Sequence, residues 1–107
     1  MCIIKFMFDW GANDTCIWSV NKESEEQIGE GILGLEHFPL SDELSATIKN
    51  LCSEYQTALN WKEPQAGIVW SKEQIDDFKA RAQNAYNRFV TSIDEGITVE
   101  NWIDTCF

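Results

Sequence analysis

The side chains in this chain that could do chemistry are mainly carboxylates, with a single histidine and four cysteines beside them. Eighteen Asp and Glu stand against eight Lys and Arg, which gives a formal net charge of −10 over 107 residues. A carboxylate excess of this size attracts basic partners and repels nucleic acid and acidic membranes. The composition therefore predicts a basic protein partner, with no direct contact to nucleic acid and none to a membrane.

The carboxylates concentrate in two segments. Residues 22–43 carry seven carboxylates and one lysine, and residues 94–104 carry four carboxylates and no basic residue. Such asymmetry is typical of a face that binds a basic protein, and solubility alone is the competing explanation. The predicted partner-binding carboxylates are Glu23, Glu25, Glu26, Glu30, Glu36, Asp42, Glu43, Asp94, Glu95, Glu100 and Asp104.

Five tryptophans are more than one small core needs. Trp10 and Trp61 fall in turn-like segments, and Trp102 is out of phase with the apolar residues around it. Aromatic side chains that are exposed beside charged residues are typical of protein interfaces. We therefore predict that these three tryptophans contact the partner, although covering the edges of a sheet would also explain them.

His37 and the cysteine thiols are the candidates for acid–base or nucleophilic catalysis. No local motif pairs the histidine with a thiol, so we predict no catalytic residue. The four cysteines are too scattered for a zinc site or a dense disulfide scaffold, and we expect free thiols in a cytoplasmic protein. These thiols are Cys2, Cys16, Cys52 and Cys106.

Cofactor and metal motifs are weak. The glycines at 29, 31 and 34 match GxGxxG, but nucleotide binding needs a strand before that loop and a helix after it, whereas an acidic helix is expected to precede it. Calcium loops place carboxylates at fixed alternate positions around a glycine, and Asp9, Asp14 and the glutamates of 23–26 do not follow that pattern. We predict neither cofactor nor metal.

The elements that must position these side chains start with an apolar strand. Residues 2–8 predict a mostly buried strand rather than a signal peptide, because Lys5 interrupts the run and Asp9 ends it. Residues 16–20 predict its hairpin partner, and the alternation over 97–103 predicts a third strand. A short acidic helix over 22–28 has Asn21 as its N-cap, and residues 29–39 are expected to be irregular.

Two longer helices carry clear start signals and apolar stripes. The first begins at Ser41 and is expected to end near Asn60; the second begins at Ser71, with Gln74 completing a capping box, and ends by Gly96. The chain therefore predicts one α+β domain over residues 1–107. We expect a small three-stranded sheet, of two N-terminal strands plus the C-terminal strand, covered on one face by the two long helices and the short acidic helix. The first and last strands should be neighbours.

Four short motifs resemble a loose family of small acidic bacterial proteins of unknown activity. They are Asp9-Trp10, Ile17-Trp18-Ser19, Pro39-Leu40-Ser41 and Trp70-Ser71. In size, acidity and lack of catalytic groups the chain is also similar to immunity proteins, which neutralise contact-delivered or bacteriocin-type toxins. This similarity implies a stoichiometric inhibitor whose partner is a basic toxin domain, such as a nuclease.

Two alternatives stay open. An acidic mimic of nucleic acid, such as an anti-restriction or anti-CRISPR protein, would use carboxylates in place of phosphates, in a regular elongated array. An enzyme would use His37 or a cysteine thiol together with groups from distant parts of the chain. The sequence makes no prediction of oligomeric state.

Overall fold

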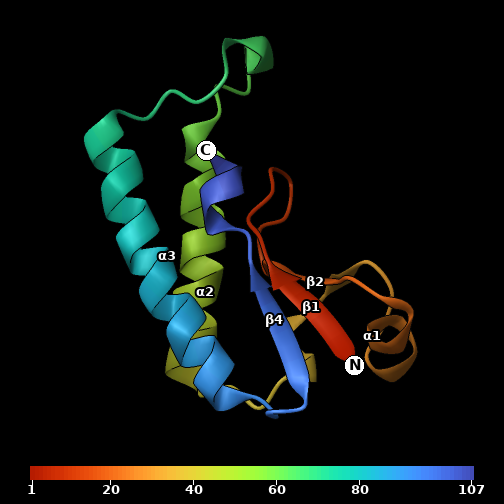
Figure 1. Ribbon diagram of the computed structural model, residues 1–107. Helices are drawn as coiled ribbons and strands as arrows, with labels where there is room; N and C mark the ends of the chain where they lie inside the picture. Colours follow the sequence, from red (N-terminus) through yellow and green to blue (C-terminus); the bar gives the residue numbers. More distant parts are fainter.

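A mixed sheet forms where the apolar segments of the two chain ends meet. The computed structural model describes all residues, 1–107, and its four strands lie in the order β3-β2-β1-β4 (Figure 1). The strands are β1 (Cys2–Phe6), β2 (Ile17–Ser19), β3 (Ile32–Leu33) and β4 (Ile97–Asn101). β1 pairs antiparallel with β2 and parallel with β4, which confirms the predicted hairpin and the neighbouring first and last strands.

The sheet has four strands, so the prediction of three was wrong. The additional strand, β3, lies in the segment that was expected to be irregular, where Leu33 pairs with Ile17 of β2. Leu33 is buried in the core, whereas the glycines on either side of the strand give no local sign of it. Packing against β2 therefore fixes a two-residue strand that periodicity alone does not reveal.

Two long helices pack side by side against one face of the sheet (Figure 1). They are α2 (Asp42–Tyr55) and α3 (Lys72–Ser92), and the predicted N-caps are present at both. Ser71 Oγ accepts from the Gln74 N–H (3.2 Å) and Gln74 Oε1 accepts from the Ser71 N–H (2.8 Å), which completes the capping box.

The first long helix ends earlier than predicted, and the second ends before Gly96 as expected. α2 ends at Tyr55 instead of near Asn60, and a 3₁₀ turn (Gln56–Ala58) follows it. The side-chain amide of Gln56 donates to the Cys52 carbonyl (3.1 Å), the group that a continuing helix would offer to the backbone N–H of Gln56. α3 ends at Ser92, because Ile93 turns to an extended conformation and buries its side chain.

The short helix α1 (Lys22–Gln27) lies at the end of the sheet where β1 begins (Figure 1). Its N-cap, Asn21, accepts from the N–H of Ser24 (3.0 Å) and from the N–H of Ile3 (3.2 Å), so one side chain caps the helix and ties it to β1. Ser24 contacts Ser19, which shares a sheet face with the buried Ile4. α1 therefore lies on the same side of the sheet as α2 and α3, as predicted.

The core fills the space between the sheet and the helix pair. Phe6 and Phe8 follow the inner face of β1 and contact Phe78 and Phe89 of α3.

All four cysteines are buried and free. None of the helices has the length and apolar character needed to cross a membrane.

Candidate functional site

Three segments rich in carboxylates lie toward the end of the sheet where β1 and β4 begin. Cys2 lies opposite Ile97, so the turn before β4 lies beside Met1, which also accepts from Asn21 at the start of α1. The first turn of α2 reaches the same end, where Glu43 pairs with Arg88 near the end of α3 (3.2 Å). We call the carboxylates of this region the acidic end: Glu23, Glu25, Glu26, Asp42, Glu43, Asp94 and Glu95.

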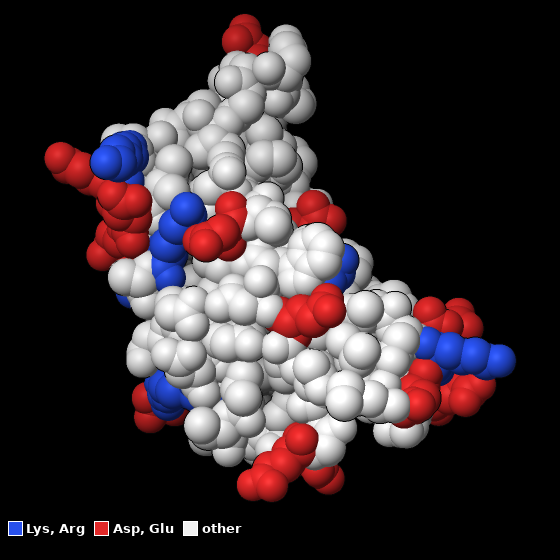
Figure 2. All heavy atoms as spheres, viewed as in Figure 1, with Lys and Arg blue, Asp and Glu red and all other residues white.

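The acidic end is only partly neutralised within the chain. Glu23 pairs with the amino group of Met1, and Glu26 lies 3.9 Å from Lys22 across one turn of α1. Glu25, Asp94 and Glu95 are exposed and form no ion pair. In Figure 2, acidic side chains gather over α1 and at the lower end of the same view. This end therefore presents a negative field to an approaching partner.

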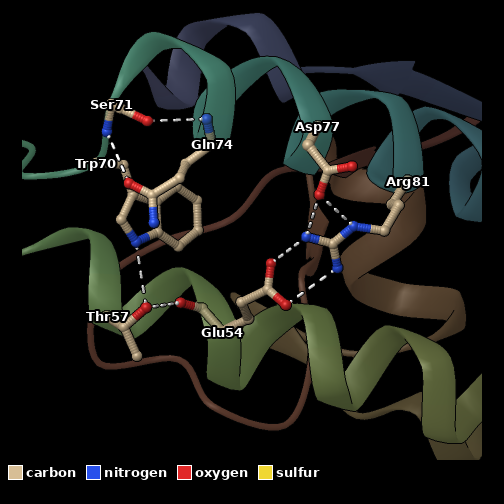
Figure 3. A network of polar contacts seen from close by, with 7 residues as sticks. All are labelled: Glu54, Thr57, Trp70, Ser71, Gln74, Asp77 and Arg81. Atoms are coloured by element: carbon tan, nitrogen blue, oxygen red, sulfur yellow. Dashed lines mark hydrogen bonds and ion pairs between the residues drawn. The ribbon is translucent and has the colours of Figure 1, made fainter.

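Two carboxylates of the helix pair, Glu54 and Asp77, are neutralised by an arginine within the chain. Arg81 of α3 donates to both carboxylate oxygens of Glu54 in α2, and its Nε donates to Asp77 at 3.0 Å (Figure 3). These two carboxylates raise the pKa of the Arg81 guanidinium, and the hydrogen bonds that Arg81 donates to Glu54 are the largest cause. The arrangement ties α2 to α3, and its charge is largely satisfied internally.

The same close view shows how the start of α3 is fixed to the end of α2. Trp70 Nε1 donates to Thr57 Oγ1 (3.2 Å), whose hydroxyl donates to the Glu54 carbonyl (2.7 Å) (Figure 3). The Ser71–Gln74 capping box follows directly after Trp70. These contacts therefore fix the start of α3 to the end of α2, while Glu73 and Asp76 nearby are exposed and form no ion pair.

The opposite face of the sheet carries no helix: none crosses in front of the strands in Figure 1. One row of paired residues crosses all four strands on this face, Ile32 beside Trp18, Trp18 beside Lys5, and Lys5 beside Glu100. Val20 continues the outward alternation after β2 and is 41% exposed. We call this surface the open sheet face and define it by Lys5, Trp18, Val20, Ile32, Glu100 and Trp102.

The indole ring of Trp102 contacts both charged side chains of the open sheet face, Lys5 and Glu100. Lys5 Nζ lies 4.4 Å from the ring centroid of Trp102, and Trp102 Nε1 donates to Glu100 Oε1 (3.0 Å). Lys5 is the only basic residue in the four strands. In Figure 2 the surface over the strands is mostly uncharged, with charged groups around it. The predicted residues Glu100 and Trp102 are thus brought together here, beside side chains that were not predicted.

Two predicted tryptophans lie at the opposite end of β1 from the acidic end, near the β1–β2 connection. Trp10 is half-buried and stacks on Tyr55, with ring centroids 5.4 Å apart, and its buried Nε1 has no hydrogen-bond partner. It lines an apolar pocket of about 340 Å³ with Phe107. Trp61 is 56% exposed and donates to the Gln56 carbonyl (2.8 Å). The fold therefore separates these two side chains from the carboxylates of α1.

The remaining predicted carboxylates are dispersed. Glu30 and Glu36 are exposed before and after β3, and Asp104 lies 3.6 Å from Lys79 of α3. The fourteen predicted residues therefore do not form one continuous patch. Most of the carboxylates share the acidic end, and two residues lie on the open sheet face.

The groups considered for catalysis do not assemble. His37 is exposed in a 3₁₀ turn, while every thiol is buried. Burial raises the pKa of the Cys16 thiol well above its ordinary value, which keeps the sulfur protonated. The GxGxxG segment contains β3 instead of a loop between a strand and a helix, and no three His, Cys, Asp or Glu side chains are arranged to hold a metal ion.

The sequence did not predict the open sheet face, although one of its residues carried a signal. Lys5 did carry a signal, since a charge inside an apolar strand marks the second face of that strand. Ile32 carried none, because its neighbour Trp18 is brought beside it by the pairing of β3 with β2. Trp18 was assigned to the sheet, which is correct, but it was not considered as a contact residue.

The comparisons with known proteins identify one family. A family model described as Serratia CdiI immunity protein-like matches residues 3–102. The matched range includes the three helices and all but the first residue of the four strands. No curated protein matches the chain. The similarity to immunity proteins that size, acidity and the absence of catalytic groups indicated is confirmed.

Proposed function

The chain belongs to the Serratia CdiI immunity protein-like family, and we propose that it neutralises the toxin of a contact-dependent inhibition system by binding it stoichiometrically. The family match over residues 3–102 is the observation that carries this proposal. An inhibitor of this kind needs a complementary surface and no chemistry of its own, which suits a chain whose thiols are buried and whose histidine stands alone.

We further propose that the toxin presents a basic surface. The net charge of −10 and the exposed carboxylates of the acidic end favour a cationic partner. A nuclease fits this chemistry, because enzymes that act on nucleic acid hold the phosphate backbone with Lys and Arg. Binding over that basic surface would cover the active site or block the path of the substrate.

The acidic end supplies steering in this proposal. Charge complementarity raises association rates above the ordinary range for proteins, and the effect falls as salt is added. Rapid capture matters for an immunity protein, since a free toxin continues to act until it is bound. We place the chain in the cytoplasm, in keeping with four thiols that are free rather than bridged.

Complex formation tests the proposal. The experiment uses as its probe a toxin domain whose gene lies directly upstream of the gene for this chain. The domain is purified in an inactive form, mixed with the chain and analysed by size-exclusion chromatography with light scattering. We expect a complex of one toxin with one copy of the chain. An unrelated acidic protein of similar net charge is the control for non-specific attraction. No complex at micromolar concentration, or equal retention of the control protein, would contradict the proposal.

A further inference from the structure

We propose that the open sheet face is the central contact through which the chain binds its basic toxin. This inference rests on the proposed function and assigns it a surface. The carboxylates of the acidic end then act as the rim of the interface, and the side chains of the strands form its middle.

The first argument is the exposure of apolar side chains that share this face. Val20 is 41% exposed, Ile32 is 43% exposed, and Trp102 is 37% exposed. Trp18 stands between Ile32 and Lys5 in the cross-strand row and is half-buried. Single exposed apolar residues are ordinary, but a group of them on one face marks an interaction site.

Of the other exposed apolar residues, Met1 (72% exposed) directly precedes β1, and three more serve as a comparison. Trp61, Val69 and Val90 are exposed to a similar or greater extent, but they lie in the 59–69 connection and on α3. None of them is on the sheet. Three exposed apolar side chains therefore lie in the sheet region, with Ile32 in β3 and with Val20 and Trp102 directly after β2 and β4.

The second argument is the charge around this face. The strands contribute one carboxylate, Glu100, and one cation, Lys5, which is held against the ring of Trp102. Asp94 and Glu95 of the acidic end lie in the turn before β4, at the edge of the face, and exposed Asp9 follows β1 at the other end. An apolar middle with an acidic rim fits a partner whose own apolar patch is bordered by Lys and Arg.

The side chains of Lys5, Glu100 and Trp102 also offer a route for recognition. Lys5 Nζ already makes the cation–π contact with the ring of Trp102, 4.4 Å from its centroid, so a cation of the partner would approach Glu100 instead. Glu100 is the carboxylate next to that ring, and its Oε1 already accepts from the indole N–H (3.0 Å). A partner cation placed here would be met by the Glu100 carboxylate beside the ring.

A pair of matched variants tests the surface. Val20→Lys places a cation in the open sheet face, and Val90→Lys makes the same substitution on α3 at nearly the same exposure, 41% against 39%. Both variants change the net charge equally. With the upstream-encoded toxin domain as the probe, we expect Val20→Lys to weaken binding at least tenfold and Val90→Lys to change it less than twofold.

A second variant separates binding from folding. Val20→Thr keeps the β-branched shape and the net charge while it removes apolar surface. We expect it to weaken binding severalfold with little change in melting temperature. If binding by Val20→Lys and Val20→Thr equals that of the wild type, or if Val90→Lys weakens it as much, the open sheet face is not the contact. If the wild-type chain binds no toxin, the proposed function itself fails.

Discussion

Charge reversal on α1 gives the sharpest test of electrostatic steering. Substituting Lys for Glu23, Glu25 and Glu26 changes the formal net charge from −10 to −4, because each reversal adds two positive charges. Glu23 and Glu26 are 52% and 66% exposed, so their interactions with an approaching toxin pass mainly through water. The dielectric of water therefore governs the size of the effect.

The magnitude follows from the screened Coulomb interaction. Two unit charges about 10 Å apart in water interact by about 0.4 kcal/mol, and salt at about 0.15 M reduces this to about 0.1 kcal/mol. Reversing a carboxylate changes each of its interactions by about twice that value. Three reversals facing about three toxin cations then raise the association barrier by about 2 kcal/mol, which slows association roughly thirtyfold.

The assay is stopped-flow association with the toxin domain at several salt concentrations. At about 1 M salt the same pairs contribute about 0.3 kcal/mol, so the difference from the wild type should fall below about twofold. The matched control reverses Glu63, Glu73 and Asp76, which are also exposed and form no ion pair but lie around the start of α3. The control matches the α1 variant in its change of net charge, but it reverses one first-turn carboxylate, Glu73, whereas the α1 variant reverses two, Glu23 and Glu25.

Equal slowing by both triple variants would show that total charge, not the acidic end, sets the association rate. An unchanged rate for the α1 variant at 0.15 M salt would refute the steering argument outright. Melting temperatures of both variants confirm that the fold is retained during the comparison.

Three further predictions concern stability and the buried groups. Arg81→Met should lower the free energy of unfolding by about 1 kcal/mol, because both ion-pair partners are partly exposed, and should lower the melting temperature by roughly 4–8 °C. Arg88→Met loses a single contact and should lower stability less. Equal losses for the two variants in calorimetry would contradict this prediction. Burial raises the pKa of Tyr55 above its ordinary value, so stability should fall as pH rises above about 10, where only the unfolded chain loses this proton. The absorbance difference between wild type and Tyr55→Phe should show no ionisation near pH 10 in the folded protein, and a transition there would be inconsistent with burial. Cys16 should resist alkylation by iodoacetamide at pH 8 in the folded chain and react after unfolding, as mapped by mass spectrometry, and rapid native labelling would contradict its environment.

Local signals in the sequence predicted most of the elements. The Ser71–Gln74 capping box spans four consecutive residues, so the sequence alone reveals it, and the helix that follows it begins at Lys72. The apolar run after Met1 and the alternation at 97–101 likewise predicted β1 and β4. Their adjacency followed from the need of an isolated strand for a partner, but the parallel direction of the pair did not.

The features that depend on distant contacts could not be predicted. Trp10 was expected at an interface, and it is half-buried because Tyr55, 45 residues away, stacks against it. β3 exists because Leu33 pairs with Ile17, and no periodicity marks a strand of two residues. Which sheet face lacks a helix is likewise a property of the whole fold, so the open sheet face emerged only from the structure.

Titration of toxin activity with this chain tests the central claim most directly. The active toxin domain is held at a fixed concentration well above the dissociation constant, and the chain is added in small steps while substrate turnover is followed. The account predicts that activity falls linearly and reaches zero at one copy of the chain per toxin. Activity that persists at a large molar excess would contradict neutralisation by binding, and complete inactivation by a small fraction of an equivalent would show that the chain acts as a catalyst instead.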